Sequence, residues 1–169
     1  MASASVIKQA AVPGLHTAPT LADLKQSSTL YNQLPSDEAQ PPLLLNHSQE
    51  IRKILTRYNV QDKFGIHLIH GHFEIPSDQV MLGHYFESPA GCWTKPVPIE
   101  DVDTSNIHGH TFKLSLDGIL VAYEYREGPP INVSEIDPSF FEDIFRYLLE
   151  HNLTDIFGLQ ALHHGPSSP

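Results

Sequence analysis

The sequence predicts an α+β domain built on a curved, mainly antiparallel sheet or half-open barrel of about five strands, with two N-terminal helices and one C-terminal helix. Three observations predict it. Apolar residues recur at helical spacing near both ends of the chain, and short strand-like runs fill the middle. An Asp117-Gly118 pair joins two of these runs as a hairpin turn would. Helices that flank a series of strands are typical of this class.

The composition predicts one domain with loose ends. Of the 169 residues, 40% are hydrophobic, which is enough to build a core. We assign residues 20–162 to the domain, 1–19 to a flexible N-terminal arm and 163–169 to a flexible tail. The formal net charge of −10 argues against nucleic acid and anionic membranes as partners. The chain begins without a basic and apolar secretory leader, so we expect a cytoplasmic protein.

Helices are expected at three places. Thr20 is a candidate N-cap for a helix over residues 20–34, and Ser48 for a second helix over 46–60. A third helix begins near Asp137-Pro138, because proline is tolerated in the first turn. Its apolar stripe comprises Phe141, Ile144, Phe145, Leu148 and Leu149. A short strand, or an apolar segment that closes the core, follows over residues 155–162.

Strands are expected between the second and third helices. The first covers residues 64–75 and reaches a second, over 80–87, through a hairpin loop at 76–79. The prolines of residues 91–101 indicate an edge strand or a connector. Residues 107–127 form a hairpin, in which a two-residue turn at Asp117-Gly118 fixes the register. The opposed pairs are then Phe112 with Tyr123, His110 with Tyr125, and His108 with Glu127, while Glu124 and Arg126 lie on the other, solvated face.

Histidines are the strongest functional signal. The chain has 11 of them, and the motif His-Gly-His occurs at both 70–72 and 108–110. Side chains at i and i+2 on a strand point the same way about 7 Å apart, so two imidazoles can approach one ion. Antiparallel strands would bring both motifs to one rim of the sheet. The sequence therefore predicts a site for one divalent transition metal, Zn, Fe, Mn, Ni or Cu. The candidate ligands are His70, His72, His84, His108 and His110.

Acidic and phenolic groups accompany these histidines. Glu74 follows His72 on the same predicted face, and His84 is expected to face His70 across the loop at 76–79. The candidate catalytic residues are Glu74 or Glu127, as ligand or general base, and Tyr125, as a hydrogen-bond donor to substrate. The run from His70 to Glu74 resembles the ligand pattern of cupin-type metal sites over its five residues, with a shorter spacing to the acid. That resemblance implies a metal site on a sheet.

Three functions fit this pattern. The leading hypothesis is a metal-dependent oxygenase, isomerase or lyase that acts on a small, partly apolar organic molecule in a histidine-lined pocket. The first alternative is a metal-free dehydratase, cyclase or isomerase with a His/Glu acid–base pair. The second alternative is a ligand-binding or interaction protein without catalysis, whose histidines satisfy one another.

Overall fold

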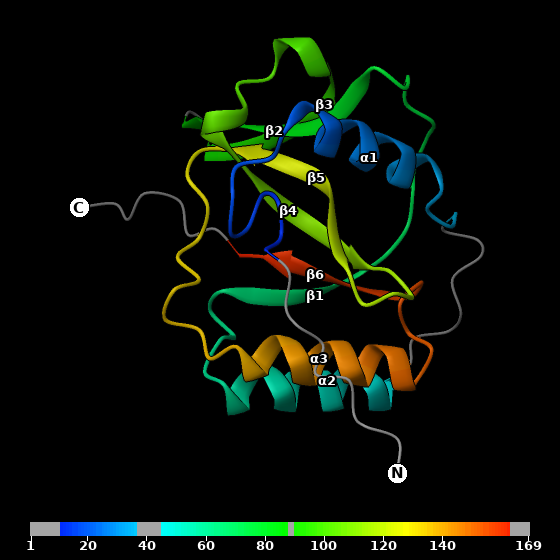
Figure 1. The fold of residues 1–169 in the computed structure, drawn as a ribbon, viewed down its shortest axis with the longest axis vertical. Helices are drawn as coiled ribbons and strands as arrows, with labels where there is room; N and C mark the ends of the chain where they lie inside the picture. The colour runs from blue at the N-terminus through cyan, green and yellow to red at the C-terminus, as the bar shows by residue number, and fades with distance from the viewer. Residues whose placement is uncertain (1–10, 37–44, 88–89, 163–169) are drawn as a thin grey trace.

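A computed structural model describes residues 11–36, 45–87 and 90–162, and it confirms the α+β class (Figure 1). Three helices accompany a six-stranded mixed sheet that does not close into a barrel. The helices are α1 (Leu21–Asn32), α2 (Leu45–Arg57) and α3 (Ser139–Glu150). The strands are β1 (Phe64–Leu68), β2 (Gln79–Glu87), β3 (Ala90–Pro98), β4 (Ile107–Leu114), β5 (Leu120–Glu127) and β6 (Phe157–Ala161).

The sheet has the strand order β1-β6-β4-β5-β2-β3. All neighbouring strands are antiparallel except β2 and β5, which run parallel. The expected hairpin through residues 76–79 was wrong, because β1 ends at Leu68 and pairs with β6, whereas β2 pairs with β3 and β5. As a result, β1 and β2 lie in opposite halves of the sheet (Figure 1).

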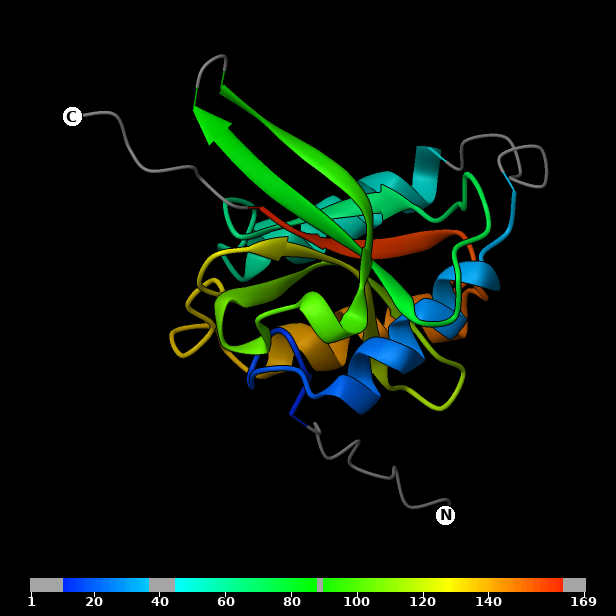
Figure 2. The same ribbon diagram turned by 90° about the horizontal axis from the view of Figure 1, so that it is seen from above.

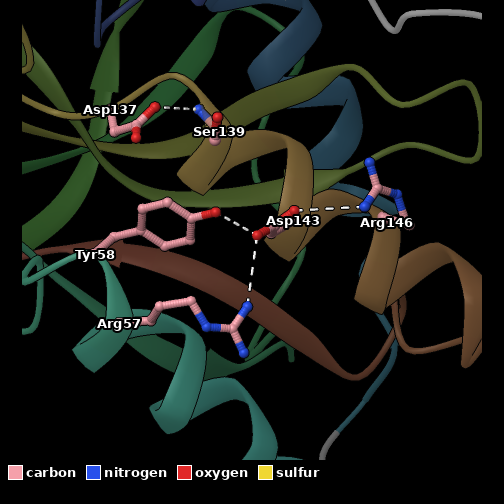
Figure 3. A network of polar contacts seen from close by, with 6 residues as sticks. All are labelled: Arg57, Tyr58, Asp137, Ser139, Asp143 and Arg146. Carbon is pink, nitrogen blue, oxygen red and sulfur yellow. Dashed lines mark hydrogen bonds and ion pairs between the residues drawn. The ribbon is translucent and has the colours of Figure 1, made fainter.

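Helices α2 and α3 pack together beside β1 (Figure 1). Their apolar residues join the main core, in which the rings of Phe64 and Phe140 stack with centroids 5.7 Å apart. A polar network also links the two helices, because Asp143 accepts a hydrogen bond from Tyr58 and pairs with Arg57 and Arg146 (Figure 3).

The ends of the helices follow the sequence signals in part. Thr20 caps α1 as expected, and it forms a reciprocal capping box with Asp23. Helix α3 begins directly after Pro138, as the position of that proline predicts. Ser48, by contrast, is not an N-cap, because it lies buried inside α2, which already includes Leu45.

Part of the predicted N-terminal arm packs against the sheet. Val12 and Leu15 are buried, and the backbone oxygen of Gly14 accepts a hydrogen bond from the N–H of Gly109 in β4. Burial of these two apolar side chains explains the packing. The remaining residues of the predicted arm, 1–10, and the predicted tail, 163–169, lie outside the described residues.

The register between β4 and β5 differs from the expected one by one residue. A five-residue loop, 115–119, separates the strands, so the Asp117-Gly118 pair is only part of the turn. Phe112 therefore lies opposite Ala122, and Gly109 opposite Tyr125. Between these two pairs, Thr111 lies opposite Glu124 in an irregular, bulged stretch. A shift of one residue exchanges the two faces of a strand.

The hairpin of β2 and β3 extends beyond the rest of the sheet (Figure 2). Its aromatic side chains are unusually exposed for their size, most of all Trp93 at 64%. His84, which lies opposite Trp93, belongs to this hairpin and not to the region of the two His-Gly-His motifs. Among the described residues, no helix is long and apolar enough to cross a membrane.

Candidate functional site: a buried polar cluster

The sheet has an apolar and a polar face. Gly109 belongs to the apolar face, since a Cβ atom there would lie 2.4 Å from the ring of Phe112 and 3.1 Å from Cβ of Ala122. His108 and His110 flank Gly109 and therefore point to the opposite face. The bulge that follows Gly109 lets Phe112 return to the apolar face, and so it separates the histidines from the core of the same strand.

The strand pairings extend the polar face across the sheet. Thr111 lies opposite both Gln160 on β6 and Glu124 on β5, and His108 lies opposite Arg126. His67 on β1 joins the same row, because its partner Gly158 is two residues from Gln160. We use the name polar cluster for this row and the side chains that cover it. Its members are Tyr31, His67, His70, His72, His108, His110, Thr111, Tyr123, Glu124, Arg126 and Gln160.

The second His-Gly-His motif is almost completely buried. His108 is 1% exposed and His110 is 5% exposed. The amide nitrogen of Gln160 lies 3.0 Å from Nε2 of His110, so the amide donates and the imidazole carries its proton on Nδ1. Burial, followed by the positive charge of Arg126, lowers the pKa of His110 to about 3. His110 is therefore neutral around pH 7.

Glu124 is the carboxyl group of the cluster. Burial raises its pKa, and Arg126, the next largest influence, opposes that rise. His72 and His70 also act on Glu124, which places the carboxyl within electrostatic reach of the first His-Gly-His motif. A titratable group perturbed by both desolvation and specific charges is a common feature of functional sites.

The first His-Gly-His motif lies in an irregular segment and not on a strand. The ring centroid of His70 is 5.5 Å from that of His67 and 4.6 Å from that of His72. Nδ1 of His70 lies 2.8 Å from the backbone oxygen of Leu68 and donates to it, which leaves Nε2 as the acceptor. Burial and the two neighbouring histidines lower the pKa of His67. His72 is exposed, so the cluster meets solvent on this side.

Several buried polar atoms of the cluster have no hydrogen-bond partner of ordinary geometry within the part of the chain that the structure describes. They are the hydroxyl groups of Tyr31, Thr111 and Tyr123, Nδ1 of His110, and Nε of Arg126. Weaker polar contacts join Thr111 to Tyr123 and Glu124, Tyr31 to the backbone of His72, and His110 to the backbone of Ala161. The three hydroxyl-bearing residues are each no more than 2% exposed. Buried polar groups are nearly always hydrogen-bonded, so a concentration of unpaired ones indicates a place for a polar ligand or water.

The predicted catalytic residues lie elsewhere. Glu74 is exposed in the segment between β1 and β2. Glu127 pairs with His84, at 2.6 Å between Oε1 and Nδ1. Tyr125 faces the apolar side, where its hydroxyl lies 2.8 Å from Oγ of Ser27, and burial raises its pKa to about 12. The one-residue change of register accounts for this outcome, because it replaces Tyr125 and Glu127 by Glu124 and Arg126 on the histidine face.

The predicted metal ligands are brought together only in part. His67 links the two motifs electrostatically, because it acts on His110 and is itself influenced by His70 and His72. However, within residues 11–36, 45–87 and 90–162 no three His, Cys, Asp or Glu side chains are arranged to hold a metal ion. His70, His72, His108 and His110 therefore share a region without forming a ligand set in this conformation, and His84 lies apart from them.

Comparison with known proteins gives no relationship on which to draw: no family model, no curated protein and no solved structure matches the chain. The function must therefore be argued from the site itself.

Sequence reasoning missed several members of the cluster. The sequence pattern predicts Glu124 and Arg126 on a solvated face, and His67 is not among the candidate ligands that it indicates. The alternation of Tyr and charged residues in Tyr123-Glu124-Tyr125-Arg126 was the available signal. On a strand with neighbours on both sides, this alternation predicts Glu124 and Arg126 together on one face and Tyr125 on the other. The irregular pairing at Thr111 brings Tyr123 to the face of Glu124.

Proposed function

We propose that the protein is a small enzyme that transfers protons on a small organic molecule bound at the polar cluster, with Glu124 as general acid and base. The observation that supports the proposal best is the position of Glu124 beside buried hydroxyl groups that have no hydrogen-bond partner of ordinary geometry among the described residues. Such groups can orient a substrate and stabilise charge that develops during reaction, because they are already fixed and shielded from water. This corresponds to a metal-free isomerase or dehydratase, which we expect to act in the cytoplasm.

The proposed reaction begins at an acidic C–H bond of the substrate. The Glu124 carboxylate takes the proton and becomes a carboxylic acid, and the electron pair of the broken bond forms an enolate. The enolate oxygen accepts a hydrogen bond from the Tyr123 hydroxyl. Glu124 then returns the proton, either to another carbon, which completes an isomerisation, or to a departing hydroxyl group, which leaves as water. A raised pKa suits a carboxyl group that must act in both directions.

Hydrogen exchange at carbon tests this proposal without a known substrate. The protein is incubated in D2O with acetone, pyruvate and 2-oxobutyrate, and the loss of the C–H signals next to each carbonyl is followed by NMR. We expect exchange of at least one probe above the protein-free rate, and a loss of roughly 10² to 10⁴-fold in Glu124→Gln. Glu74→Gln and Glu127→Gln are matched controls that should retain the wild-type rate. No exchange above background, or equal rates in wild type and Glu124→Gln, would refute the proposal.

A metal-dependent enzyme is the second candidate. The contacting rings of His67, His70 and His72 favour it, as does the hydrogen bond from Nδ1 of His70 to a backbone carbonyl, which is usual for metal-binding imidazoles. A small movement of the segment that carries His70 and His72 would be required, since no ligand set is formed among the described residues. Elemental analysis of protein purified without a histidine tag tests this candidate. About one equivalent of a transition metal, lost in His70→Ala, would favour it over the metal-free enzyme.

A further inference from the structure

The polar cluster has buried donors at both ends of the short stretch of β5 from Tyr123 to Arg126. At one end is the guanidinium group of Arg126, whose Nε is buried without a partner of ordinary geometry among the described residues. At the other end are the Tyr31 and Tyr123 hydroxyl groups, whose rings lie 6.5 Å apart. Along β5, Glu124 lies between Tyr123 and Arg126 and opposite Thr111. It also interacts electrostatically with Arg126 and with both tyrosines.

Arg126 contacts Tyr85 through its Nη1 and Cζ atoms, and this contact leaves Nε to bind a ligand. Its Nη1 donates to the Tyr85 hydroxyl at 3.3 Å, and its Cζ lies 5.6 Å from the centre of the Tyr85 ring. Gly83, opposite Arg126 on β2, makes room for the side chain, since a Cβ atom there would lie 3.0 Å from Cγ of Arg126. The guanidinium group therefore lies against Tyr85 on the polar face, and its hydrogen bond to Tyr85 does not use Nε.

The charge of the cluster favours a ligand with a single negative charge. Arg126 is the one arginine or lysine among the members of the cluster defined above, and His110 is neutral. A carboxylate matches a guanidinium group in charge and in planar geometry. With Glu124 as a carboxylate, a bound monocarboxylate leaves one net negative charge on the Arg126, Glu124 and ligand groups, whereas a phosphate dianion leaves two, in a chain whose net charge is already −10.

We propose that the polar cluster binds a short hydroxy or oxo monocarboxylic acid, whose carboxylate pairs with Arg126 and whose second oxygen accepts a hydrogen bond from Tyr31 or Tyr123. The carbon atoms between these two groups then lie beside Glu124. This inference rests on the proposed function, because it names the substrate class of the same site. It also explains why a carboxyl group, an arginine and several buried hydroxyl groups are gathered in the polar cluster.

Binding measurements on the full chain test the inference. The probes are 3-hydroxybutyrate, its amide, butyrate and inorganic phosphate, and each is titrated by ligand-observed NMR in the millimolar range. We expect 3-hydroxybutyrate to bind at least tenfold more tightly than either its amide or butyrate, and phosphate not to displace it. Arg126→Gln should remove the preference for acid over amide. Tyr123→Phe should weaken the binding of 3-hydroxybutyrate but not that of butyrate.

Two controls separate a specific loss of binding from a general loss of positive charge and from unfolding. Lys95→Gln removes an exposed cation that lies over Trp93 in the projecting hairpin, and it should bind like wild type. Thermal unfolding confirms that each variant is folded, and Tyr123→Phe, which loses one hydroxyl, remains informative if Arg126→Gln does not fold. Equal binding of acid and amide, equal binding of phosphate, or no saturable binding of the acids would overturn the inference. Binding of the acids without hydrogen exchange at carbon would refute the proposed function and leave this inference standing. Hydrogen exchange on acetone, without a preference for acids in binding, would refute this inference and leave the proposed function standing.

Discussion

Gly109 lies directly opposite Tyr125 across β4 and β5. This single pairing decides which residues accompany the buried histidines. It places Tyr125 on the apolar face with Phe112, and it turns Glu124 and Arg126 towards His108 and His110. The candidate acid–base group of the protein is therefore Glu124, and the phenol of Tyr125 has a structural role.

Gly109→Ala should destabilise the protein. The added Cβ would meet the ring of the fully buried Phe112 at 2.4 Å, in a closely packed core. We expect a loss of about 1 to 3 kcal/mol in the free energy of unfolding, measured with urea. Gly118→Ala is the matched control, because Gly118 has a φ of +79° and no atom within 4 Å of the added group. Its cost should be only the backbone strain of about 1 kcal/mol. If Phe112→Leu fails to recover any stability in the Gly109→Ala background, the proposed clash is not the cause.

Tyr125→Phe should affect stability but not the site. Oγ of Ser27 donates to the backbone oxygen of Asp23, so Tyr125 is the donor in the 2.8 Å contact with Ser27. Loss of this buried hydrogen bond should lower the free energy of unfolding in urea by about 1 kcal/mol. The rate of C–H exchange of the probes and the affinity for ligands should remain at wild-type levels. Tyr123→Phe should show the opposite pattern. A loss of C–H exchange activity in Tyr125→Phe would show that Tyr125 takes part in catalysis, as the sequence predicted.

Asn32→Ala should release the segment that carries His70 and His72. The Asn32 amide donates to the backbone oxygen of Ile75 and accepts from its N–H, both at 2.8 Å. Without this clamp we expect a loss of about 1 to 3 kcal/mol and faster amide exchange at residues 70–76, followed by mass spectrometry. Asn32→Asp keeps the acceptor and should protect the Ile75 amide in part. Unchanged exchange in both variants would show that the burial of Ile75 alone holds the segment.

His110→Gln should change how stability depends on pH. The pKa of His110 is about 3 in the folded protein and about 6.5 in the unfolded chain. The unfolded state therefore binds a proton first as the pH falls, and the stabilisation present above pH 6.5 is lost progressively towards pH 3. Relative to His110→Gln, the wild type should lose up to about 1.4 kcal/mol per pH unit within this window. Urea unfolding from pH 7 to pH 4 measures the difference. Parallel curves for the two proteins would show that His110 does not remain neutral.

The fold class and the helices could be predicted because their signals are local. The capping box at Thr20 and the apolar stripe of α3 need no knowledge of the rest of the chain. The site could not be assigned correctly, because it depends on strand register and on a bulge. Those features are determined by non-local contacts, such as the packing of Gly109 against Phe112 and its hydrogen bond to Gly14. The parallel pairing of β2 with β5, which removes His84 from the other histidines, is likewise absent from any local pattern.

The position of β6 between β1 and β4 has a consequence for biosynthesis. A nascent chain that has not yet released residues 157–161 from the ribosome has no strand to join β1 to the rest of the sheet, although β1 was made long before. Until then, β4 presents an unpaired edge, and Phe64 lacks part of its surroundings. The polar cluster, which includes both His67 and Gln160, is therefore assembled among the last parts of the molecule, and slow release of β6 would prolong exposure to aggregation.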